Sequence, residues 1–266
     1  MPRYKILQNQ MTALGNYLKK AEKEKWAIGQ FNFYNPDQLS AIIETARKLK
    51  SPIILGSSER QNKVFGLEQT VALVTEQKKK FRHPFFLHLD HSHSFDYIKM
   101  AIDAGYDSIH FDGSHLPLDE NINEAKKIVK YAKENGLPVE GEIEAIKAVG
   151  VSAGIMTNPA KARQFLKESH VDTLAVNIGN FHGISASGVN PKLDLERLKK
   201  IKEAVGEFPL VLHGGSGIRP ADIKEAIKWG IAKINIATEI RQAKGLTEVK
   251  KVVEKKIMLF GSHNKA

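Results

Sequence analysis

The stretch Pro84-Phe-Phe-Leu-His-Leu-Asp-His-Ser-His93 is an apolar run that ends in an acid, Asp90, beside a histidine, His91. Buried strands of four to eight residues are typical of sheet and barrel cores. We therefore expect a strand that presents both polar side chains at its C-terminal edge, where an acid stands next to a metal ligand.

Two later apolar runs end in the same way. The run 173–179 leads to His182-Gly183, and the run 209–212 leads to His213, which is followed at once by Gly-Gly-Ser-Gly. A single histidine at a strand end is commonly a hydrogen-bonded structural residue, but three imidazoles at three strand ends predict a divalent metal with one open position, as in catalytic zinc sites. Other histidines lack this support and are expected in the core or at the rim, with His93 the first alternative candidate: His88, His93, His110 and His115.

The alternation of strands and helices continues along the chain. Eight apolar runs separated by segments of helical periodicity, over 266 residues, predict an α/β fold, a (β/α)8 TIM barrel that forms a single domain, 1–266. Enzymes of this fold carry their chemistry at the C-terminal ends of the strands. The expected strands are 27–33, 52–56, 84–91, 108–112, 138–143, 173–179, 209–213 and 232–237, with an N-terminal helix over 1–26 and a C-terminal helix with a polar, frayed tail over 240–266.

The composition indicates where the protein is located and which residues could bind a metal. The chain is 42% hydrophobic, yet it has no run of eighteen apolar residues and no apolar signal core near Met1. We expect a cytoplasmic protein with no membrane partner. Because the chain has no cysteine, a metal site must use His, Asp, Glu or main-chain oxygen.

The net charge of +10 would attract nucleic acid, a membrane surface or a small anionic substrate. The lysines are spread over helical patterns such as 126–130 and 199–202, without interleaved aromatic residues. This distribution favours solvated helix faces, and a nucleic-acid partner is not expected.

Glu140, Glu142 and Glu144 alternate along the expected fifth strand, so their side chains face the same way. Three carboxylates that point into a barrel are costly unless they are neutralised. Either a nearby cation compensates them, or the strand ends early and one or two of them are solvated. The sequence leaves both interpretations open.

The segment 213–220, His-Gly-Gly-Ser-Gly-Ile-Arg-Pro, precedes a helix and has the composition of an anion cradle, because small residues allow several N–H groups to point at one phosphate. Asn235-Ile-Ala-Thr238 follows on the next strand. Loops after strands seven and eight form the recurrent phosphate site of such barrels, so we expect a phosphate here. Tight turns and a helix cap are the alternative interpretation.

These residues resemble those of the class II, zinc-dependent fructose-bisphosphate aldolases and their tagatose-bisphosphate relatives. The resemblance covers nearly the whole chain, and it is specific for the superfamily rather than for the sugar. It rests on nine ordered motifs: Phe31-Asn-Phe-Tyr-Asn35, Ser58-Glu59, His88-Leu-Asp-His91, Asp112-Gly-Ser-His115, Glu140-Gly-Glu142, His182-Gly183, Pro191-Lys-Leu-Asp194, Leu212-His-Gly-Gly-Ser-Gly217 and Lys233-Ile-Asn-Ile-Ala-Thr-Glu239.

The resemblance implies that His91, His182 and His213 bind Zn²⁺ and that Asp90 is the acid/base. Zinc would act as a Lewis acid when the C3–C4 bond breaks, and Asp90 would take the C4 hydroxyl proton in cleavage and return it in condensation. The resemblance also implies carboxylates behind the metal, or ligands of a second divalent or monovalent cation, at Asp112 and Glu142. Substrate and phosphate contacts would come from Asn32, Ser58, Gly183, Gly214, Gly215, Ser216, Asn235, Ala237 and Thr238.

Three segments depart from the family pattern. After Glu142 the family has a Gly-Gly pair and a mobile acidic loop that supplies a further proton-transfer carboxylate, whereas 144–154 has no such acidic run. The segment 184–190 is longer than usual and lacks the usual Tyr-Lys, which affects the phosphate and cation pocket. The region 242–255 is short and removes helix and subunit contacts.

The expected function is metal-dependent aldol cleavage and condensation of a ketose bisphosphate, with fructose 1,6-bisphosphate giving dihydroxyacetone phosphate and glyceraldehyde 3-phosphate in glycolysis. The alternatives are an aldolase for tagatose bisphosphate or another phosphosugar, such as a deoxy-phosphogluconate, and a barrel that binds sugar phosphates without turnover. The altered segment 144–154 favours the non-catalytic alternative, and the intact Asp90-His91 pair opposes it. A homodimer or homotetramer is the expected assembly.

Overall fold

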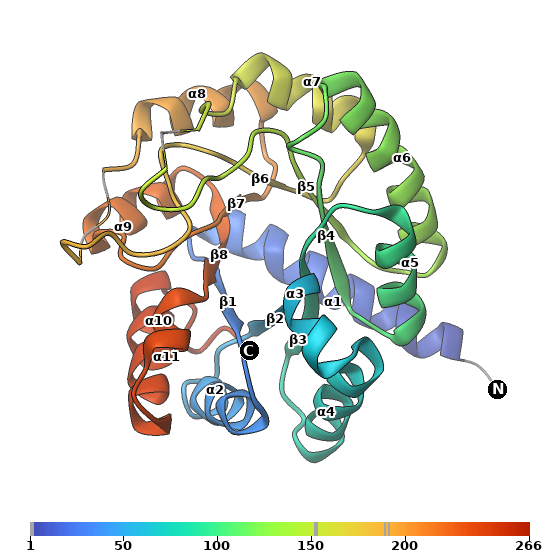
Figure 1. The fold of residues 1–266 in the computed structure, drawn as a ribbon, viewed down its shortest axis with the longest axis vertical. Coiled ribbons are helices and arrows are strands. Elements are labelled where there is room, and N and C mark those ends of the chain that lie inside the picture. The colour runs from blue at the N-terminus through green and yellow to red at the C-terminus, as the bar shows by residue number, and fades with distance from the viewer. Residues whose placement is uncertain (1–2, 152–153, 189, 191) are drawn as a thin grey trace.

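A computed structural model describes residues 3–151, 154–188, 190 and 192–266, with side chains from residue 13 onward. Its strands pair in chain order into a closed parallel barrel, which confirms the predicted (β/α)8 fold (Figure 1). The strands are β1 (Ile28–Asn32), β2 (Ile53–Ser58), β3 (Phe85–Ser92), β4 (Ser108–Asp112), β5 (Val139–Glu142), β6 (Thr173–Ala175), β7 (Leu210–Leu212) and β8 (Ile231–Ile236).

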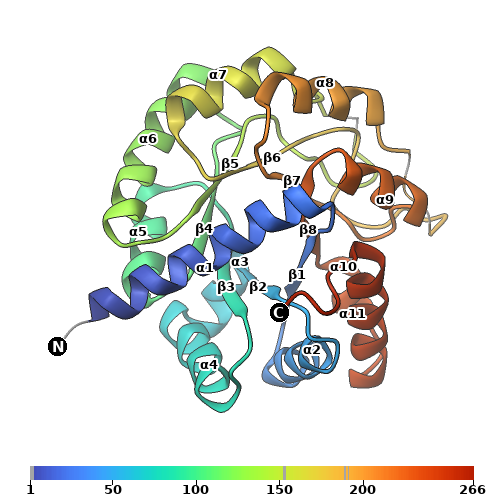
Figure 2. The same ribbon diagram turned by 180° about the vertical axis from the view of Figure 1, so that it is seen from behind.

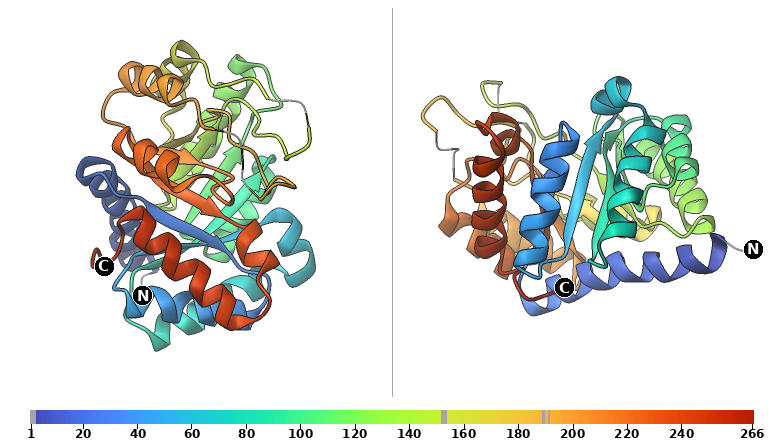
Figure 3. Two further views of the ribbon diagram at one scale, coloured as in Figure 1. Left: turned by 90° about the vertical axis from the view of Figure 1, so that its left-hand side faces the viewer. Right: turned by 90° about the horizontal axis from the view of Figure 1, so that it is seen from below.

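Helices form a ring outside the strands (Figures 1 and 3). α2 begins at Pro36, because the Asn35 side chain accepts a hydrogen bond from the N–H of Gln38 at 2.8 Å and Pro36 occupies the first turn. The helices are α1 (Arg3–Glu24), α2 (Pro36–Lys48), α3 (Glu59–Phe65), α4 (Leu67–Lys80), α5 (Phe95–Ala104), α6 (Leu118–Glu134), α7 (Pro159–Ser169), α8 (Leu195–Val205), α9 (Pro220–Lys228), α10 (Thr238–Gln242) and α11 (Leu246–Phe260).

The barrel interior carries polar residues in pairs two positions apart. Side chains at i and i+2 of a strand point to the same side, so both members of each pair face the barrel axis. All ten residues are buried, so each polar group needs a partner inside the barrel. The pairs are Gln30 and Asn32, His88 and Asp90, His110 and Asp112, Glu140 and Glu142, and Lys233 and Asn235.

The N-terminal helix α1 closes the end of the barrel that lies away from these polar strand ends. It crosses in front of the strands in Figure 2 and runs beneath them in the right-hand view of Figure 3. Leu14 and Leu18 of α1 pack with Ile28, Ile54 and Phe86 from the N-terminal halves of three strands. This packing leaves the C-terminal ends of the strands as the open face.

The sixth strand is shorter than the predicted 173–179, because side chains take the backbone hydrogen bonds after Ala175. The N–H of Asn177 donates to Thr157 Oγ1, and the N–H of Ile178 donates to Asn180 Oδ1. Asn side chains compete with a sheet ladder in this way. The chain therefore leaves the barrel early and carries His182 on a loop.

The C-terminal segment is ordered against α2 rather than frayed, which corrects the prediction for the polar tail. The N–H groups of Asn264 and Ala266 donate to the carbonyl oxygens of Leu49 and Lys50, and Ser262 is bonded to Ser51. Backbone donors with fixed acceptors hold the tail in place.

Among the described helices, none combines the length and apolar character needed to cross a bilayer.

Candidate active site

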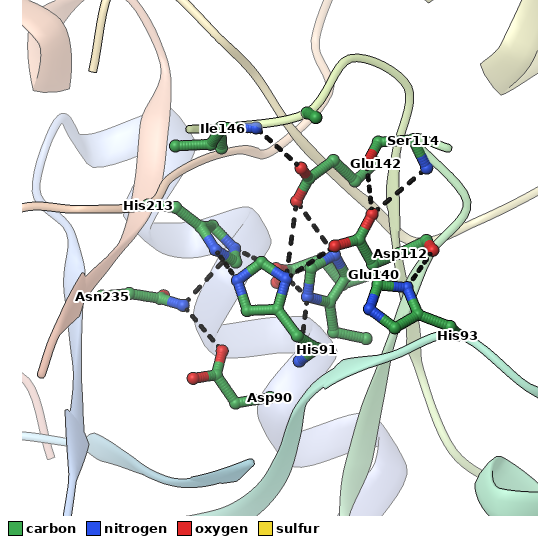
Figure 4. A network of polar contacts seen from close by, with 12 residues as sticks. Asp90, His91, His93, Asp112, Ser114, Glu140, Glu142, Ile146, His213 and Asn235 are labelled. Atoms are coloured by element: carbon green, nitrogen blue, oxygen red, sulfur yellow. Dashed lines mark hydrogen bonds and ion pairs between the residues drawn. The ribbon is translucent and has the colours of Figure 1, made fainter. Parts of the chain in front are cut away.

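The carboxylate of Asp90 is held at the open end of β3 by two amide donors. Asn32 Nδ2 donates to Oδ2 at 2.8 Å. Asn235 Nδ2 donates to Oδ1 at 3.1 Å, as Figure 4 shows. Burial alone would raise the pKa of Asp90, but the positive charges of His91 and Lys233 hold it well below its ordinary value. Asp90 is therefore an ionised, oriented proton acceptor at neutral pH.

Two imidazoles stand beside this acid, each tied to a carboxylate on its outer side (Figure 4). His91 Nδ1 lies 2.9 Å from Asp112 Oδ2, and His213 Nε2 lies 2.8 Å from Glu140 Oε1. Because an ionised carboxylate only accepts hydrogen bonds, both of these ring nitrogens carry a hydrogen. The inner nitrogens, His91 Nε2 and His213 Nδ1, face each other at 3.0 Å. Two facing lone pairs require a proton or a cation between them.

The electrostatics of the pair agree with this geometry. Burial lowers the pKa of His91, but the hydrogen bond to Asp112 and the charges of Asp90 and Glu142 outweigh it and raise the value to about 9. Burial holds the pKa of His213 well below its ordinary value. Without a metal, one proton on His91 thus bridges the inner nitrogens. A divalent cation fits the same place, since histidine ligands usually donate their second nitrogen to a carboxylate.

Behind His213, Glu140 is neutralised by a buried lysine. Lys233 Nζ lies 2.7 Å from Glu140 Oε2, and both side chains are inside the barrel. Burial raises the pKa of Glu140, but Lys233 and His213 bring it well below its ordinary value. The nearby cation expected for the alternating glutamates is therefore present at Glu140.

The other two glutamates differ from each other. The strand ends at Glu142, so Glu144 lies beyond it, as the early-ending interpretation predicted. Glu144 is nevertheless 8% exposed rather than solvated, and burial raises its pKa. Glu142 Oε1 accepts a hydrogen bond from the N–H of Ile146 at 3.3 Å, and its Oε2 lies 4.0 Å from His91 Nδ1.

A second set of ligand atoms lies beside the imidazole pair. His91, Asp112 and Glu142 each offer one atom within 4.8 Å of the others. Ser114 fixes Asp112, because its N–H and hydroxyl donate to Oδ1 at 3.1 and 2.6 Å. The predicted pair Asp112 and Glu142 is therefore close enough to His91 for the three to share one cation.

The third predicted ligand, His182, reaches the site on a short paired segment. Its N–H donates to the Lys147 carbonyl at 2.9 Å, and its carbonyl accepts from Val149 at 2.8 Å. The ring centroid lies 5.0 Å from that of His91 and 5.9 Å from that of His213. Burial lowers the pKa of His182 to about 4, so this ring is neutral and able to bind metal at neutral pH.

His110 is fully buried, in line with the predicted position in the core or at the rim. Its ring lies 4.6 Å from that of His91 and 4.9 Å from that of His213, so it borders the site. One of two groups of potential ligand atoms among the described residues includes His110 and leaves out His182: Asp90, His91, His110 and His213.

A cavity of about 290 Å³ opens beside Asp90. Seven of the nine residues predicted to contact substrate or phosphate line it, together with Asp90 and His182. The other two, Ser58 and Gly215, do not line the cavity. Ser58 caps α3 by accepting a hydrogen bond from the N–H of Gln61, and the N–H of Gly215 donates to the Asn235 carbonyl at 3.0 Å. The seven are Asn32, Gly183, Gly214, Ser216, Asn235, Ala237 and Thr238.

The glycines of this cavity are required by close approach. Gly214 has φ +63°, and a Cβ there would collide with the carbonyl oxygen of Phe181. Gly183 has φ +106°, which side-chain-bearing residues rarely adopt. Asn190 ties their loops together, since its Nδ2 donates to the carbonyls of Gly183 and Ser216 at 2.9 Å. The cavity wall is thus main chain that a ligand can approach.

Sequence reasoning missed two residues of the cavity, Ala148 and Arg241. Arg241 follows Thr238 by three positions on α10, so helical spacing could have indicated it. Ala148 gives no such signal, because it arrives through its bridge to His182. In the predicted segments and motifs, residues 1, 2, 152, 153, 189 and 191 lie outside the described part of the chain.

Together, the fold and the site define a class: a parallel-barrel enzyme whose acid and imidazoles are grouped closely enough to hold a metal ion, beside a cavity lined by glycine-rich loops. Residues 12–256 match the family described as fructose-bisphosphate aldolase class-II. The chain belongs to that family, and it is an aldolase, an aldehyde-lyase that acts on a phosphorylated sugar.

Solved structures agree with this assignment. The YdjI aldolase from Escherichia coli K12 is 35% identical, with a TM-score of 0.83 over 95% of this chain and 98% of that one. A candidate fructose-1,6-biphosphate aldolase from Coccidioides immitis is 28% identical, with a TM-score of 0.84 over 94% and 96% of the two chains. Fructose-bisphosphate aldolase from Campylobacter jejuni, at 22% identity and a TM-score of 0.82 over 96% of each chain, shares the fold.

Proposed function

We propose that this aldolase cleaves fructose 1,6-bisphosphate to dihydroxyacetone phosphate and glyceraldehyde 3-phosphate, and catalyses the reverse condensation, in cytoplasmic glycolysis. One observation carries the proposal. The ionised Asp90, held by Asn32 and Asn235, lines the same cavity as the glycine-rich loops and stands beside the facing nitrogens of His91 and His213. An acid/base, a metal position and a phosphate cradle are the three parts that such a reaction needs.

We propose zinc as the metal, with His91, His182 and His213 as its ligands. The set is three imidazole nitrogens without thiolate, which suits a catalytic zinc site once the proton on His91 is displaced. When bound, the cation supplies Lewis-acid polarisation of the substrate carbonyl. Asp112 and Glu140 hold the outer nitrogens of His91 and His213, so both rings keep the orientation that a cation requires.

In this proposal Asp90 moves the proton at the C4 hydroxyl. During cleavage the proton of the C4 hydroxyl passes to the Asp90 carboxylate, and the electron pair of that O–H bond forms the aldehyde C=O bond. The C3–C4 bond breaks, and its electron pair stays on the dihydroxyacetone phosphate fragment as an ene-diolate. In condensation Asp90 returns that proton to the new hydroxyl. The two amide donors on Asp90 favour its ionised form, and proton transfer to a positioned carboxylate is ordinary general-base catalysis.

The phosphate is proposed to lie against Gly183, Gly214, Ser216 and Thr238, where backbone approaches the cavity without side-chain bulk. Arg241 adds a positive charge at the same cavity. A planar guanidinium pairs well with phosphate oxygens. These contacts fix the register of the sugar so that C4 lies near Asp90.

The proposal also covers a second cation, the assembly and the alternative substrates. A second divalent or monovalent cation is supported by the grouping of His91, Asp112 and Glu142. A homodimer or homotetramer is carried over from the resemblance. The alternatives for the substrate stay the same: tagatose bisphosphate, another phosphosugar such as a deoxy-phosphogluconate, or binding without turnover.

The test is a steady-state assay of the purified protein against a panel of ketose phosphates, with and without a chelator. We expect cleavage to be fastest with fructose 1,6-bisphosphate, to be lost with the chelator, and to return on addition of Zn²⁺. Faster cleavage of another phosphosugar would replace the substrate. Activity that survives the chelator, with borohydride trapping of substrate on a lysine, would contradict the metal mechanism.

A further inference from the structure

His91 occupies an unusual backbone position. The β3–β4 register runs from Leu89 opposite Ile109 to Ser92 opposite Phe111, so three steps of β3 match two steps of β4. His91 lies in this bulge with φ +52°, in the left-handed region. Such a conformation is uncommon for any residue other than glycine and persists only where its surroundings fix it. The bulge also takes the N–H of His91 out of the strand ladder.

His110 supplies the missing acceptor. The N–H of His91 donates to His110 Nδ1 at 3.3 Å, across from β3 to β4. Because Nδ1 accepts this hydrogen bond, the ring hydrogen lies on Nε2. His110 Nε2 and Glu142 Oε2 are 3.4 Å apart, and among the described residues neither atom has a hydrogen-bond partner. The His110 ring thus lies between the backbone of His91, to which it is hydrogen-bonded, and the carboxylate of Glu142, which its Nε2 meets in an electrostatic contact.

We propose that His110 is a positioning residue, which locks the left-handed bulge at His91 through Nδ1 and orients Glu142 through Nε2. The inference rests on the proposed function in that His91 is taken as a metal ligand. His110 is not itself a ligand in this arrangement, although it stands among the ligand atoms. Its Nδ1 lone pair is used by the His91 N–H, and its Nε2 carries the hydrogen that faces Glu142.

The consequence for His91 follows from the loss of this acceptor. The N–H lies in a part-buried position, where leaving a donor without an acceptor is costly, so a chain that lacks the His110 acceptor is driven to rearrange the bulge. Rearrangement turns the His91 ring away from Asp112 and from His213 Nδ1, the two atoms that orient it. Loss of a group that orients a metal ligand typically lowers metal affinity by about 10–100-fold.

Three substitutions separate the two contacts of the ring. In His110→Asn the side-chain oxygen replaces Nδ1 and keeps the acceptor for His91. In His110→Gln the side-chain amide replaces Nε2 and keeps the donor toward Glu142, and His110→Leu removes both. His88→Leu is the matched control, because His88 is also buried in the barrel but bonds to Ser108 at 2.8 Å rather than to His91.

Two readouts follow the ligand without using turnover. Zinc affinity is measured by chelator competition, together with the visible spectrum of the Co²⁺-substituted protein. The exchange rate of the His91 amide hydrogen is measured by NMR in the metal-free protein. We expect His110→Leu and His110→Gln to accelerate His91 exchange at least tenfold and to weaken zinc by about 10–100-fold. We expect His110→Asn to stay within about threefold of the wild type in both, with an unchanged cobalt spectrum, and His88→Leu to leave His91 exchange unchanged.

Several results would overturn the inference. Unchanged His91 exchange in His110→Leu would show that the ring does not hold the bulge. Equal loss of zinc and of the cobalt spectrum in His110→Asn and His110→Leu would make His110 a ligand instead. If the wild type binds no metal, the proposed function fails, but the amide exchange still decides whether His110 positions His91.

Discussion

Lys233 and Glu140 form an ion pair of 2.7 Å inside the barrel, and the other oxygen of Glu140 accepts the hydrogen bond that orients His213. Two strands therefore place a charge pair directly behind a predicted metal ligand. Removing one partner of a buried pair leaves the other charge uncompensated and costs about 3–5 kcal/mol. The pair thus links stability of the barrel to the position of His213.

The first prediction follows from this pair. Lys233→Met should lower the free energy of unfolding by about 3–5 kcal/mol, because Glu140 is left charged and buried. The double variant Lys233→Met, Glu140→Gln should recover part of that loss, since Gln is neutral and can still accept from His213. Urea unfolding of the metal-free proteins measures both. A double variant less stable than Lys233→Met would exclude charge compensation as the cause.

The second prediction concerns the metal. His213→Ala should reduce bound zinc well below one equivalent and abolish activity while the fold persists, because one of three ligands is removed. His170→Asn is the matched control: His170 ends α7 far from the site in the left-handed conformation, which Asn also tolerates. Zinc content by elemental analysis and far-UV circular dichroism measure the outcome. Full occupancy and activity in His213→Ala would rule out this ligand set.

The third prediction concerns the acid/base. Asp90→Ala should keep its zinc but lose turnover by about 10²–10⁴-fold, the usual contribution of a positioned proton-transfer group. The measurement is kcat beside zinc stoichiometry on the same preparation. A loss below about threefold would show that another group carries the proton.

The barrel could be predicted because its strands are buried on both faces. Runs such as 85–89 and 231–236 contain mostly apolar residues, and the helices between them begin with recognisable caps such as Asn35. The length of β6 could not be predicted. Its apolar run continues to Ile178, but the Asn180 and Thr157 side chains capture the backbone, and Thr157 is far away in sequence.

The site was predictable where single strands carry it and not where neighbouring strands combine. Asp90 and His91 follow one apolar run, so one segment indicates both. Lys233 pairs with Glu140, which is 93 residues away in the sequence. His110 bonds to the backbone of His91, which lies in a bulge of the adjacent strand. Lys233 is two positions from Asn235, and His110 is two positions from Asp112, so this spacing predicts that Lys233 and His110 point into the barrel. Which residues they contact there depends on how the strands close into the barrel.

The fourth prediction is a pH dependence at Glu144. Burial raises the pKa of this carboxyl above its ordinary value of 4.5, so above that pH the folded protein holds more protons at Glu144 than the unfolded chain. Stability is therefore lost as pH rises through the folded pKa. Glu144→Gln should be more stable than the wild type at pH 8 and nearly equal to it near pH 4. Thermal unfolding at both values tests this, and equal stability at pH 8 would contradict it.

The last prediction concerns the proton at C3 of dihydroxyacetone phosphate. In the resembling family a loop carboxylate handles that proton, a step separate from breaking the C3–C4 bond, and 144–154 has no acidic run. Glu144 is the nearest substitute in sequence, but it lines a neighbouring pocket of about 320 Å³ with Lys147 and Lys161 rather than the cavity of Asp90.

We therefore expect measurable cleavage with slow exchange of this proton for solvent deuterium, and we expect Glu144→Gln to leave both rates within about twofold, since a group outside the cavity is beyond the hydrogen-bond reach that proton transfer needs. Deuterium exchange by NMR, beside the cleavage rate, measures the two steps. A selective fall of exchange in Glu144→Gln would make Glu144 the substitute acid. Exchange faster than cleavage in both proteins would show that the altered segment does not restrict the chemistry, because the C3 proton would then move without the lost acid and without Glu144.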